Sequence, residues 1–317
     1  MDKRYNTPTS EMQSQSTTVS GTTEDLYSDD IQGAITLFDG EPYALKADIE
    51  TILFIGVDAS EERELEDEEN DQRTYNQSDV VMLFVIDHEK QSYSLIQLDR
   101  DTMADIIIAE NQDGYVMGYR QLALSFTYGT DMEDCAEHTM YAVSHLMHDI
   151  TIDHYIAITM DSIPILNDQV GGVTVTIPED MTMDDPDLIE GETVTLNGEQ
   201  ADTFVRARQE LEDPTNINRM SRQRTYMSAW RSQAITRINE DSNFAIDLVL
   251  ALSNYLYSDM DASRLSSFAN LLTDYTDNGI VTIEGQSVQG SQHMEFYVDE
   301  DALISVIRDE FYYKVEG

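Results

Sequence analysis

The sequence is short of several residue types, and each shortage excludes a class of protein. It contains one cysteine, Cys135, so no disulfide bond can form within the chain. It contains 18 lysine and arginine residues against 62 aspartate and glutamate residues, which leaves a formal net charge of −44. This charge argues against nucleic-acid binding, which needs a positive surface, and it is repelled by anionic membranes. No run of about 18 apolar residues is present, so we expect no transmembrane helix.

The first 34 residues differ in composition from the rest. They are rich in Ser, Thr, Gln and Glu and poor in apolar residues, so they cannot offset the entropy of ordering. They also lack the apolar core of a secretory signal peptide. We therefore expect 1–34 to be a disordered segment or a stem, with a non-native leader as the alternative, and 35–317 to form one domain.

Five apolar runs predict β-strands. Runs that are apolar along most of their length are typical of strands covered on both faces of a sheet. The five predicted strands are 52–57, 80–86, 94–98, 155–160 and 173–177.

Helical patterns fill much of the remaining chain, between and after these strands. Strands interleaved with helices are typical of a layered α/β domain. Two acidic stretches, 61–77 and 179–192, interrupt the pattern, and we expect both to be solvated surface loops. The predicted helices are 133–148, 162–169, 198–208, 219–238, 244–257, 262–275 and 300–311.

Arginine is concentrated in one part of this acidic chain. Arg206 and Arg208 share a face if their segment is extended, and Arg219 and Arg222 share one face of a helix. The planar guanidinium group binds phosphate oxygens in pairs, so the cluster indicates a site for a doubly charged phosphate ligand. Ordinary salt bridges to the abundant carboxylates are the alternative. The cluster is Arg206, Arg208, Arg219, Arg222 and Arg224.

Several aspartates stand at the ends of predicted strands. Asp58 follows the first strand, Asp79 precedes the second, and Asp99 and Asp101 follow the third. If these strands are neighbours, the carboxylates gather at an edge where open α/β sheets bind ligands. Oxygen-only ligation suits Mg²⁺, with substrate phosphates completing the shell. The alternative is that these aspartates are turn or cap residues.

Histidine and cysteine carry weaker signals. His138, His145 and His148 lie on one side of the helix predicted over 133–148. A zinc site is one interpretation, but no acidic base accompanies them in an HExxH-like arrangement, so solvated or core-edge histidines are the better account. Cys135 has no catalytic context and is expected to be a packed residue.

Several blocks of sequence resemble those of the LytR-CpsA-Psr family. TILFIGVDAS, QSDVVMLFVID and LIQLDRDT resemble its opening blocks, and HYIAITMDSIPILNDQVGGVTVTIPEDM resembles its central block. LNGEQADTFVRARQ, followed by NRMSRQRTYMSA, is similar to its arginine-rich signature. The resemblance runs from about Ile35 to the C-terminus, and the order and spacing of the blocks make it specific.

The resemblance implies a fold, a reaction and a location. The implied fold is a three-layer α/β/α sandwich with a central mixed β-sheet and an apolar lipid pocket. The implied reaction moves a glycopolymer, such as a teichoic acid or capsule, from a polyprenyl-pyrophosphate carrier to a peptidoglycan hydroxyl. The catalytic domain over 35–317 would work at the extracellular face of the bacterial cytoplasmic membrane, with an anchor that this chain does not contain.

The same resemblance assigns roles to individual residues. Asp79 and Asp101 are the implied ligands of Mg²⁺, with Mn²⁺ as an alternative. Arg100, Asp101 and Asp99 form the implied catalytic group, and either aspartate is a candidate to accept the proton of the attacking hydroxyl. Arginines and a divalent ion would stabilise the charge on the departing polyprenyl phosphate. The implied pyrophosphate-binding residues are Arg206, Arg208, Arg219, Arg222, Gln223 and Arg120.

The sequence departs from the family pattern mainly where the acceptor would bind. Asp99 stands where the family commonly has Pro, Gln77 where it has Arg, Asn216 where it has an acid, and Ala123 where it has Asn. The arginine signature is intact, so phosphate binding is better supported than acceptor chemistry. Two other functions therefore stay open: a non-catalytic polyprenyl-phosphate-binding envelope regulator, and a polyprenyl-pyrophosphate phosphatase.

Overall fold

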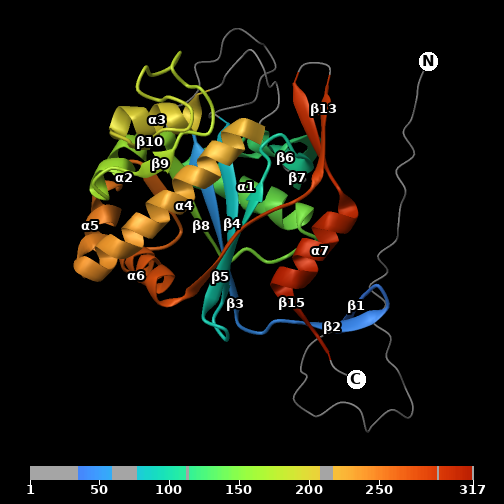
Figure 1. Ribbon diagram of the computed structural model, residues 1–317. Coiled ribbons are helices and arrows are strands. Elements are labelled where there is room, and N and C mark those ends of the chain that lie inside the picture. The colour runs from blue at the N-terminus through green and yellow to red at the C-terminus, as the bar shows by residue number, and fades with distance from the viewer. Residues whose placement is uncertain (1–34, 59–76, 112–113, 208–216, 291–292, 316–317) are drawn as a thin grey trace, which may run out of the picture. The chain divides into compact units, whose positions relative to one another are not determined.

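The computed structural model describes residues 35–58, 77–111, 114–207, 217–290 and 293–315 (Figure 1). The segment 1–34, most of the acidic stretch 61–77, and Arg208 lie outside these residues, so the predictions made for them stay predictions. The chain divides into two compact units, one made of the described residues up to Leu45 with Lys314 and Val315, and the other of Lys46–Tyr313.

The smaller unit contains a short antiparallel hairpin. Strands β1 (Ile35–Phe38) and β2 (Glu41–Leu45) pair through Asp39 and Gly40, which both have positive φ. Such a two-residue turn matches the twist of the flanking strands. At the other end of the chain, the Val315 amide donates to the Pro42 carbonyl at 3.0 Å.

The larger unit is built on a six-stranded sheet in the order β11-β8-β3-β4-β5-β12. The pairs β3–β8 and β5–β12 are parallel and the other pairs are antiparallel, so the sheet is mixed. Its strands are β3 (Ile49–Val57), β4 (Ser78–Asp87), β5 (Ser92–Leu98), β8 (His154–Thr159), β11 (Leu256–Ser258) and β12 (Thr276–Thr282).

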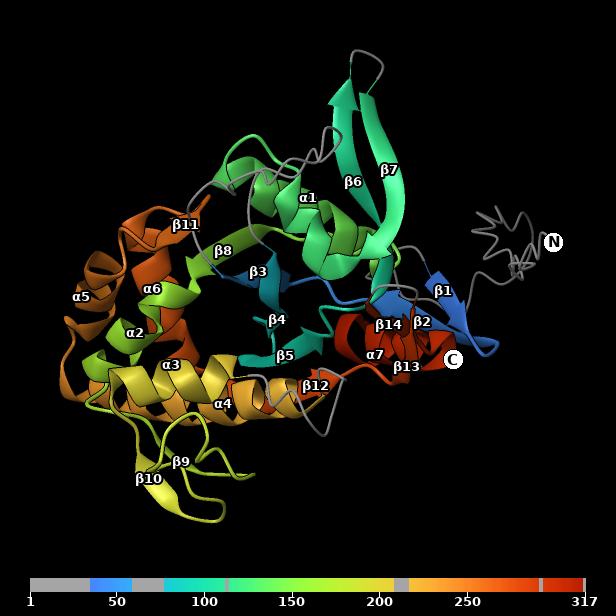
Figure 2. The same ribbon diagram turned by 90° about the horizontal axis from the view of Figure 1, so that it is seen from above.

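Helices cover both faces of this sheet, which explains the continuous apolar runs. Successive side chains of a strand point to opposite faces. Ile52 belongs to a core shared with Phe204 and Phe268 of the helices on one face, and Leu53 to a core shared with Phe126 on the other. Figure 2 shows the layers from above. The predicted α/β/α sandwich with a central mixed sheet is confirmed.

The two helical layers come from different parts of the chain. One face carries η1 (Leu122–Thr127), α1 (Met132–Leu146) and α7 (Glu300–Phe311), which leads into β15 (Tyr312–Lys314). The other face carries a larger set of helices. It consists of η2 (Met160–Ser162), α2 (Ile163–Gln169), α3 (Gly198–Arg206), α4 (Ile217–Glu240), α5 (Phe244–Ala251) and α6 (Ala262–Asp274).

Helix starts follow local sequence signals. The Asp131 side chain accepts from the Asp134 amide and begins α1. Asn197 and Gln200 form a reciprocal capping box at the start of α3. Cys135 lies in the first turn of α1, fully buried, and burial raises the pKa of its thiol to about 12. The expectation of a packed cysteine is confirmed.

Some predicted elements were wrong in type or place. The strand predicted at 173–177 is β9 (Thr174–Thr176), which pairs with β10 (Thr193–Thr195) outside the central sheet. Its two threonines are exposed, so its pattern alternates and does not fit a doubly covered strand. The helix predicted over 244–257 ends at Ala251, and β11 then forms an edge of the sheet.

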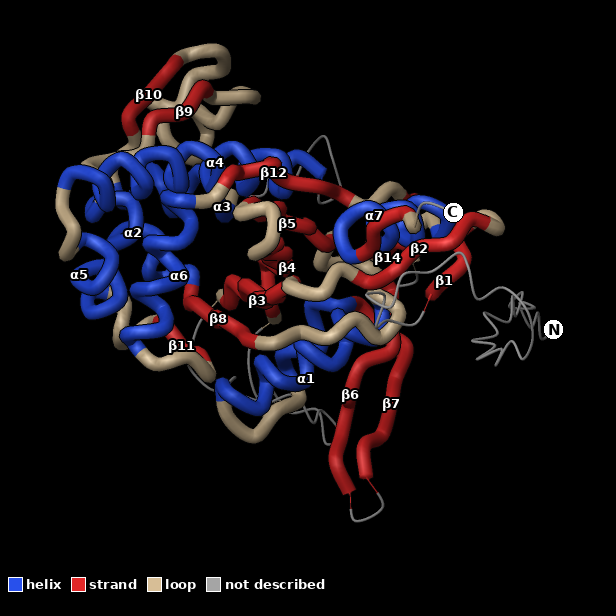
Figure 3. Tube along the Cα trace, turned by 90° about the horizontal axis from the view of Figure 1, so that it is seen from below, coloured by secondary structure: helices blue, strands red, loops and turns tan. Residues whose placement is uncertain are grey.

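Besides β1–β2, two hairpins of the larger unit have no counterpart among the predicted elements. One is β6 (Met103–Asn111) with β7 (Gly114–Gln121), and the other is β13 (Gly285–Gln289) with β14 (Met294–Val298). Figure 3 shows β6 and β7 projecting beside α1. Almost every residue of β7 is exposed, so no buried face marked it in the sequence.

The acidic stretch 179–192 is more ordered than a solvated loop. Met181 and Leu188 are fully buried within it, and the Met181 amide donates to the Leu188 carbonyl at 3.1 Å. None of the described helices has the length and apolar character that a membrane crossing requires.

Candidate functional site

The strand ends that carry the predicted carboxylates meet at one edge of the sheet. β3 and β4 are antiparallel and bring Val57 opposite Ser78. β4 and β5 are antiparallel and bring Val81 opposite Leu98. Asp58, Asp79 and the segment from Asp99 to Asp101 therefore come together, as the sequence predicted.

Arg100 is at the centre of this edge. Its Nη1 pairs with Asp79, its Nη2 donates to the Gln77 side chain, and its Nε lies 3.8 Å from Asp101 Oδ1. Arg219, from the first turn of α4, places Nη1 3.4 Å from Asp79 Oδ1. Asp79 thus links arginines that are 119 positions apart in the sequence. Both guanidinium groups are buried, which strengthens their electrostatic interactions.

Asp99 and Asp101 each accept a hydrogen bond that fixes the position of the side chain. Asp99 Oδ1 accepts from the Asp101 amide at 2.9 Å, an arrangement that fixes the turn after β5. Gln121 Nε2 donates to Asp101 Oδ1 at 2.9 Å and to the Met294 carbonyl at 2.7 Å. Gln121 was not predicted as a site residue, because it is the last residue of β7, in a hairpin that was not predicted.

Arg120 is exposed on β7, one position before Gln121. Its Nη1 donates to the Tyr119 carbonyl at 3.0 Å, a local contact. Within the described residues, no hydrogen bond or ion pair joins Arg120 to the carboxylates that contact the other arginines of the site, so its role as a phosphate ligand stays a prediction.

Arg206, the last residue of α3, faces three carboxylates. It pairs with Asp58, lies 3.6 Å from Asp161 Oδ1 and lies 3.5 Å from Asp202 Oδ1. A third of its side chain is exposed, so it is accessible to a ligand. Burial raises the pKa of Asp202 even though Arg206 acts to lower it. The site therefore contains one carboxylate that holds its charge less readily than an exposed aspartate.

Arg222 is almost fully enclosed. Its Nε donates to the Phe204 carbonyl at 2.9 Å, and its terminal nitrogens pair with Glu179 and donate to the Ala207 carbonyl. These bonds join α4 to the end of α3 and to the segment after β9. Arg222 therefore holds the Arg206 end of α3 in place, whatever it also contributes to ligand binding.

Gln223 and Tyr226 add polar groups to the buried side of α4. Gln223 is 4% exposed, and neither polar atom of its amide has a hydrogen-bond partner among the described residues. The Tyr226 hydroxyl, one helical turn later, is also without a partner there. Buried polar atoms are nearly always bonded, so such a pair is typical of a place that a ligand or water completes. Arg224 points elsewhere and donates from Nη1 to Gln97 Oε1 at 2.9 Å.

The carboxylates beside Arg100 could hold a metal ion. No group of three or more histidine, cysteine, aspartate or glutamate side chains has metal-binding geometry in the described part of the chain. Asp79 and Asp101 both contact Arg100, so they lie near one another, and their oxygens are of the type that Mg²⁺ prefers. Two carboxylates fit a magnesium ion whose remaining ligands are phosphate oxygens and water.

The three histidines of the α1 region do not share a site. His138 is buried 3.5 Å from Asp134, His145 lies 3.2 Å from Asp149, and His148 lies 3.0 Å from Glu300. Each has its own carboxylate, so the core-edge account of these histidines is the better one.

Comparisons with known proteins identify the family of this chain. The model of the LytR_cpsA_psr family matches residues 9–309. A polyisoprenyl-teichoic acid–peptidoglycan teichoic acid transferase, TagU, of Enterococcus faecalis is 25% identical over 250 residues, which are 77% of this chain and 71% of the relative. Biofilm regulatory protein A of Streptococcus mutans is 30% identical over 187 residues, 56% of this chain and 42% of the relative.

The fold has counterparts among solved structures. A structure described as TagT bound to LI-WTA covers 83% of this chain and 89% of its own, with a TM-score of 0.61 and 17% identity. This likeness establishes the shared fold. This chain spans about half the length of several curated transferase relatives that it matches. The family model covers nearly the whole chain, and the chain therefore belongs to the LytR_cpsA_psr family.

Proposed function

We propose that this protein transfers a glycopolymer from a polyprenyl-pyrophosphate carrier to a hydroxyl of a cell-wall glycan such as peptidoglycan. The observation that carries the proposal is the convergence of Arg100, Arg206 and Arg219 on carboxylates at one sheet edge of an otherwise acidic chain, with Arg222 holding the end of α3 that carries Arg206. The name of the Enterococcus relative, a teichoic acid transferase, indicates the class of reaction.

The pyrophosphate is expected to bind where arginines now contact the protein's own carboxylates. Arg206 is the most accessible of the four, and its bonds to Asp161 and Asp202 are long, at 3.6 and 3.5 Å. Phosphate oxygens form shorter, charge-assisted bonds with guanidinium groups, so a pyrophosphate would replace these contacts. Gln223 has an amide whose donor and acceptor are both available to such a ligand.

The charge balance of the site favours a divalent cation, held by Asp79 and Asp101. Among the described residues, the carboxylates that contact the four arginines include Asp58, Asp79, Asp101, Asp161, Glu179 and Asp202. The acidic side chains of this set outnumber the arginines that they contact. When bound, Mg²⁺ or Mn²⁺ would supply charge neutralisation for the pyrophosphate oxygens.

The protein's own residues account for the rest of the reaction. The hydroxyl of the acceptor attacks the phosphorus that carries the sugar, and the bond from this phosphorus to the bridging oxygen breaks. Arg100 and Arg219 stabilise the charge that develops, because they are already oriented by Asp79. Asp99 and Asp101 both stay candidates for the base, because each accepts a hydrogen bond on Oδ1, Asp99 from the Asp101 amide and Asp101 from Gln121. Asp99 is the candidate that is not also assigned to the metal ion.

The lipid tail is expected to lie in the apolar layer between the sheet and α2–α6. Gln223 and Tyr226 stand at the side of α4 that faces this layer, and Phe204 and Phe268 belong to it. This arrangement places a polar head group at the sheet edge and the tail in the layer behind it. We further propose that the reaction takes place at the extracellular face of the bacterial cytoplasmic membrane.

Binding of undecaprenyl pyrophosphate, followed by native mass spectrometry with and without magnesium, tests the site. Arg206→Ala should weaken binding about tenfold or more, the loss expected for a charge-assisted hydrogen bond. Arg237→Ala is the matched control, because Arg237 lies on α4 but pairs with Glu240 at the opposite end. Equal affinity in the two variants would remove Arg206 from the site.

The metal proposal has its own pair of variants. Asp79→Asn should abolish the increase in lipid affinity that magnesium produces, whereas Asp247→Asn, on the exposed side of α5, should not. Persistence of the full magnesium effect in Asp79→Asn would assign the ion to other ligands.

A second function, a non-catalytic envelope regulator, is favoured by one observation. Each of the four arginines already has a carboxylate partner in the protein, as expected for a site that holds its ligand reversibly. The Streptococcus relative is named a biofilm regulatory protein. An assay with labelled lipid-linked glycopolymer and peptidoglycan separates the cases. Transfer of the label to peptidoglycan would support the transferase. Binding of the lipid-linked glycopolymer without turnover would support the regulator, and release of phosphate without an acceptor would support the phosphatase.

A further inference from the structure

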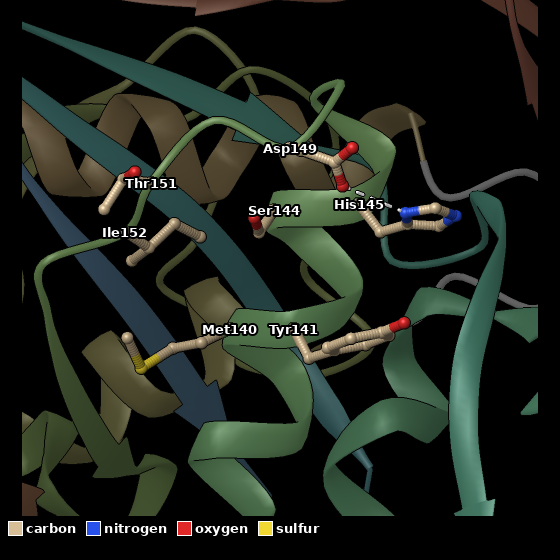
Figure 4. A pocket seen from close by; sticks show the side chains of 7 residues that line it. All are labelled: Met140, Tyr141, Ser144, His145, Asp149, Thr151 and Ile152. Carbon is tan, nitrogen blue, oxygen red and sulfur yellow. Dashed lines mark hydrogen bonds and ion pairs between the residues drawn. The ribbon is translucent and has the colours of Figure 1, made fainter. Parts of the chain in front are cut away.

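A pocket of about 350 Å³ lies on α1, on the other helical layer from the arginine site (Figure 4). It is bounded by the second half of α1 and by the loop that leads into β8. The loop reaches the start of β8, whereas Asp161, a contact of Arg206, follows its end. The pocket is therefore at the opposite edge of the sheet and is separate from the arginine site.

The loop that closes the pocket is held in a strained shape. His148 and Asp149 are consecutive residues with φ of 56° and 61°. The Asp149 amide donates to the Ser144 carbonyl at 2.8 Å, and Ser144 Oγ donates to the Ile150 carbonyl at 2.7 Å. Left-handed residues other than glycine concentrate at functional sites, where the surrounding structure keeps them in place.

Two aromatic rings form one wall of the pocket. Tyr141 and His145 are one helical turn apart, and their rings are nearly parallel, with centroids 6.1 Å apart and an interplanar angle of 17°. Tyr141 is 42% exposed, so its ring is accessible to a ligand. The face of an aromatic ring is electron-rich and attracts the C–H groups on the apolar face of a sugar ring.

The rest of the lining mixes polar and apolar groups. Met140 and Ile152 supply apolar surface, and Ser144, Asp149 and Thr151 supply oxygen atoms. Figure 4 shows the Asp149 carboxylate turned toward His145, at 3.2 Å from Nδ1. A few fixed polar groups within an apolar lining are typical of a small-molecule site.

The hairpin β6–β7 extends the aromatic surface. The Tyr115 ring contacts the His138 ring of α1, with centroids 5.9 Å apart, and Asp105 of β6 lies 4.0 Å from His145. Tyr119 is opposite Asp105 in the hairpin register. Tyr115 and Tyr119 are 55% and 50% exposed, so aromatic faces continue from the pocket along the hairpin.

We infer that this pocket and the adjoining tyrosines bind a neutral chain of pyranose sugars. Such a chain offers C–H faces to the rings and hydroxyl groups to Asp149, Ser144 and Thr151. The carboxylates of Asp105 and Asp149 would repel a phosphorylated or sulfated glycan, and the charge of −44 would repel an anionic lipid surface. The inference does not depend on the proposed transfer reaction.

Methyl NMR of the full chain tests the site directly. The protein is labelled at the methionine and isoleucine methyl groups and titrated with a tetramer of N-acetylglucosamine, and Met140→Leu identifies the Met140 signal. The Met140 and Ile152 signals should move in a saturable way. Tyr141→Ala should weaken binding about tenfold, whereas Tyr141→Phe, which keeps the ring, should change it less than about twofold.

Two controls make the result decisive. Tyr313→Ala removes a tyrosine of similar exposure elsewhere, and should leave the affinity unchanged. A sulfated tetrasaccharide should move neither methyl signal. The inference is overturned if the neutral tetramer moves neither signal, if Tyr141→Ala binds as well as the parent protein, or if the sulfated glycan binds equally well.

Discussion

The two faces of the central sheet are both apolar, yet they differ in how polar groups are buried. On the α1 face, Leu53 and Phe126 pack in a core whose buried hydroxyl groups, Ser125 and Thr139, bond to each other at 2.9 Å, although both ring nitrogens of the buried His138 lack a hydrogen-bond partner among the described residues. On the α4 face, a polar amide and two hydroxyl groups are embedded in the core without partners among the described residues, namely Gln223, Tyr93 and Tyr226. An unbonded buried polar group costs stability, so the α4 face gives up stability where a ligand head group is expected.

The largest effect is expected on the α1 face. Phe126 is fully buried there, and Phe126→Ala should lower the free energy of unfolding by about 3–5 kcal/mol, the cost of a large core cavity. Urea unfolding checks this value. Leu250→Ala, on an exposed position of α5, is the control and should change stability by less than about 0.5 kcal/mol. Equal effects in both variants would mean that the α1 face is not a tightly packed core.

The stabilities of two alanine variants should distinguish an arginine that holds the fold together, Arg222, from an arginine that is accessible to the ligand, Arg206. Arg222→Ala leaves Glu179 and two backbone carbonyls without their partner, and should cost about 3 kcal/mol of stability. Arg206→Ala removes a third-exposed side chain, and should cost less than about 1 kcal/mol. Thermal unfolding of both variants without ligand compares them. A larger loss in Arg206→Ala would reverse the assignment.

Gln223→Met tests whether the unbonded amide on the α4 face lowers stability and binds the ligand head group. The thioether fills a similar volume without unbonded polar atoms, so stability should be unchanged or rise by about 1 kcal/mol. Affinity for undecaprenyl pyrophosphate should fall about tenfold if the amide binds the head group. A destabilised variant would indicate that the amide already has a structural role.

The smallest effect concerns pH. Burial raises the pKa of Asp202 above 3.8, so the folded protein holds this proton more tightly than the unfolded chain does. Ionised Asp202 therefore opposes folding, and its cost appears as the pH rises through the raised pKa. Asp202→Asn should be more stable than the parent by no more than about 0.5 kcal/mol at neutral pH, and this gain should vanish near pH 3. A gain that is independent of pH would refute the assignment.

The sequence predicted more of the fold than of the site. The strands β3, β4, β5 and β8 were found because apolar residues occur at nearly every position, a pattern that only doubly covered strands need. The hairpin β6–β7 was not found, because its second strand is exposed along almost its whole length. β11 lies within a segment that was predicted as helix. It was not predicted as a strand, because three half-buried residues show no alternation of polar and apolar positions.

By itself, the sequence determined the layered α/β class, the family and the gathering of arginines and aspartates at the strand ends. These follow from local patterns of polarity and from the order of the motifs. Only the tertiary structure decided which carboxylate each arginine contacts, that Arg222 is enclosed while Arg206 is accessible, and that Gln121 reaches Asp101 from a separate hairpin. The reason is physical: burial and pairing depend on side chains brought together from distant positions, and no local pattern records them.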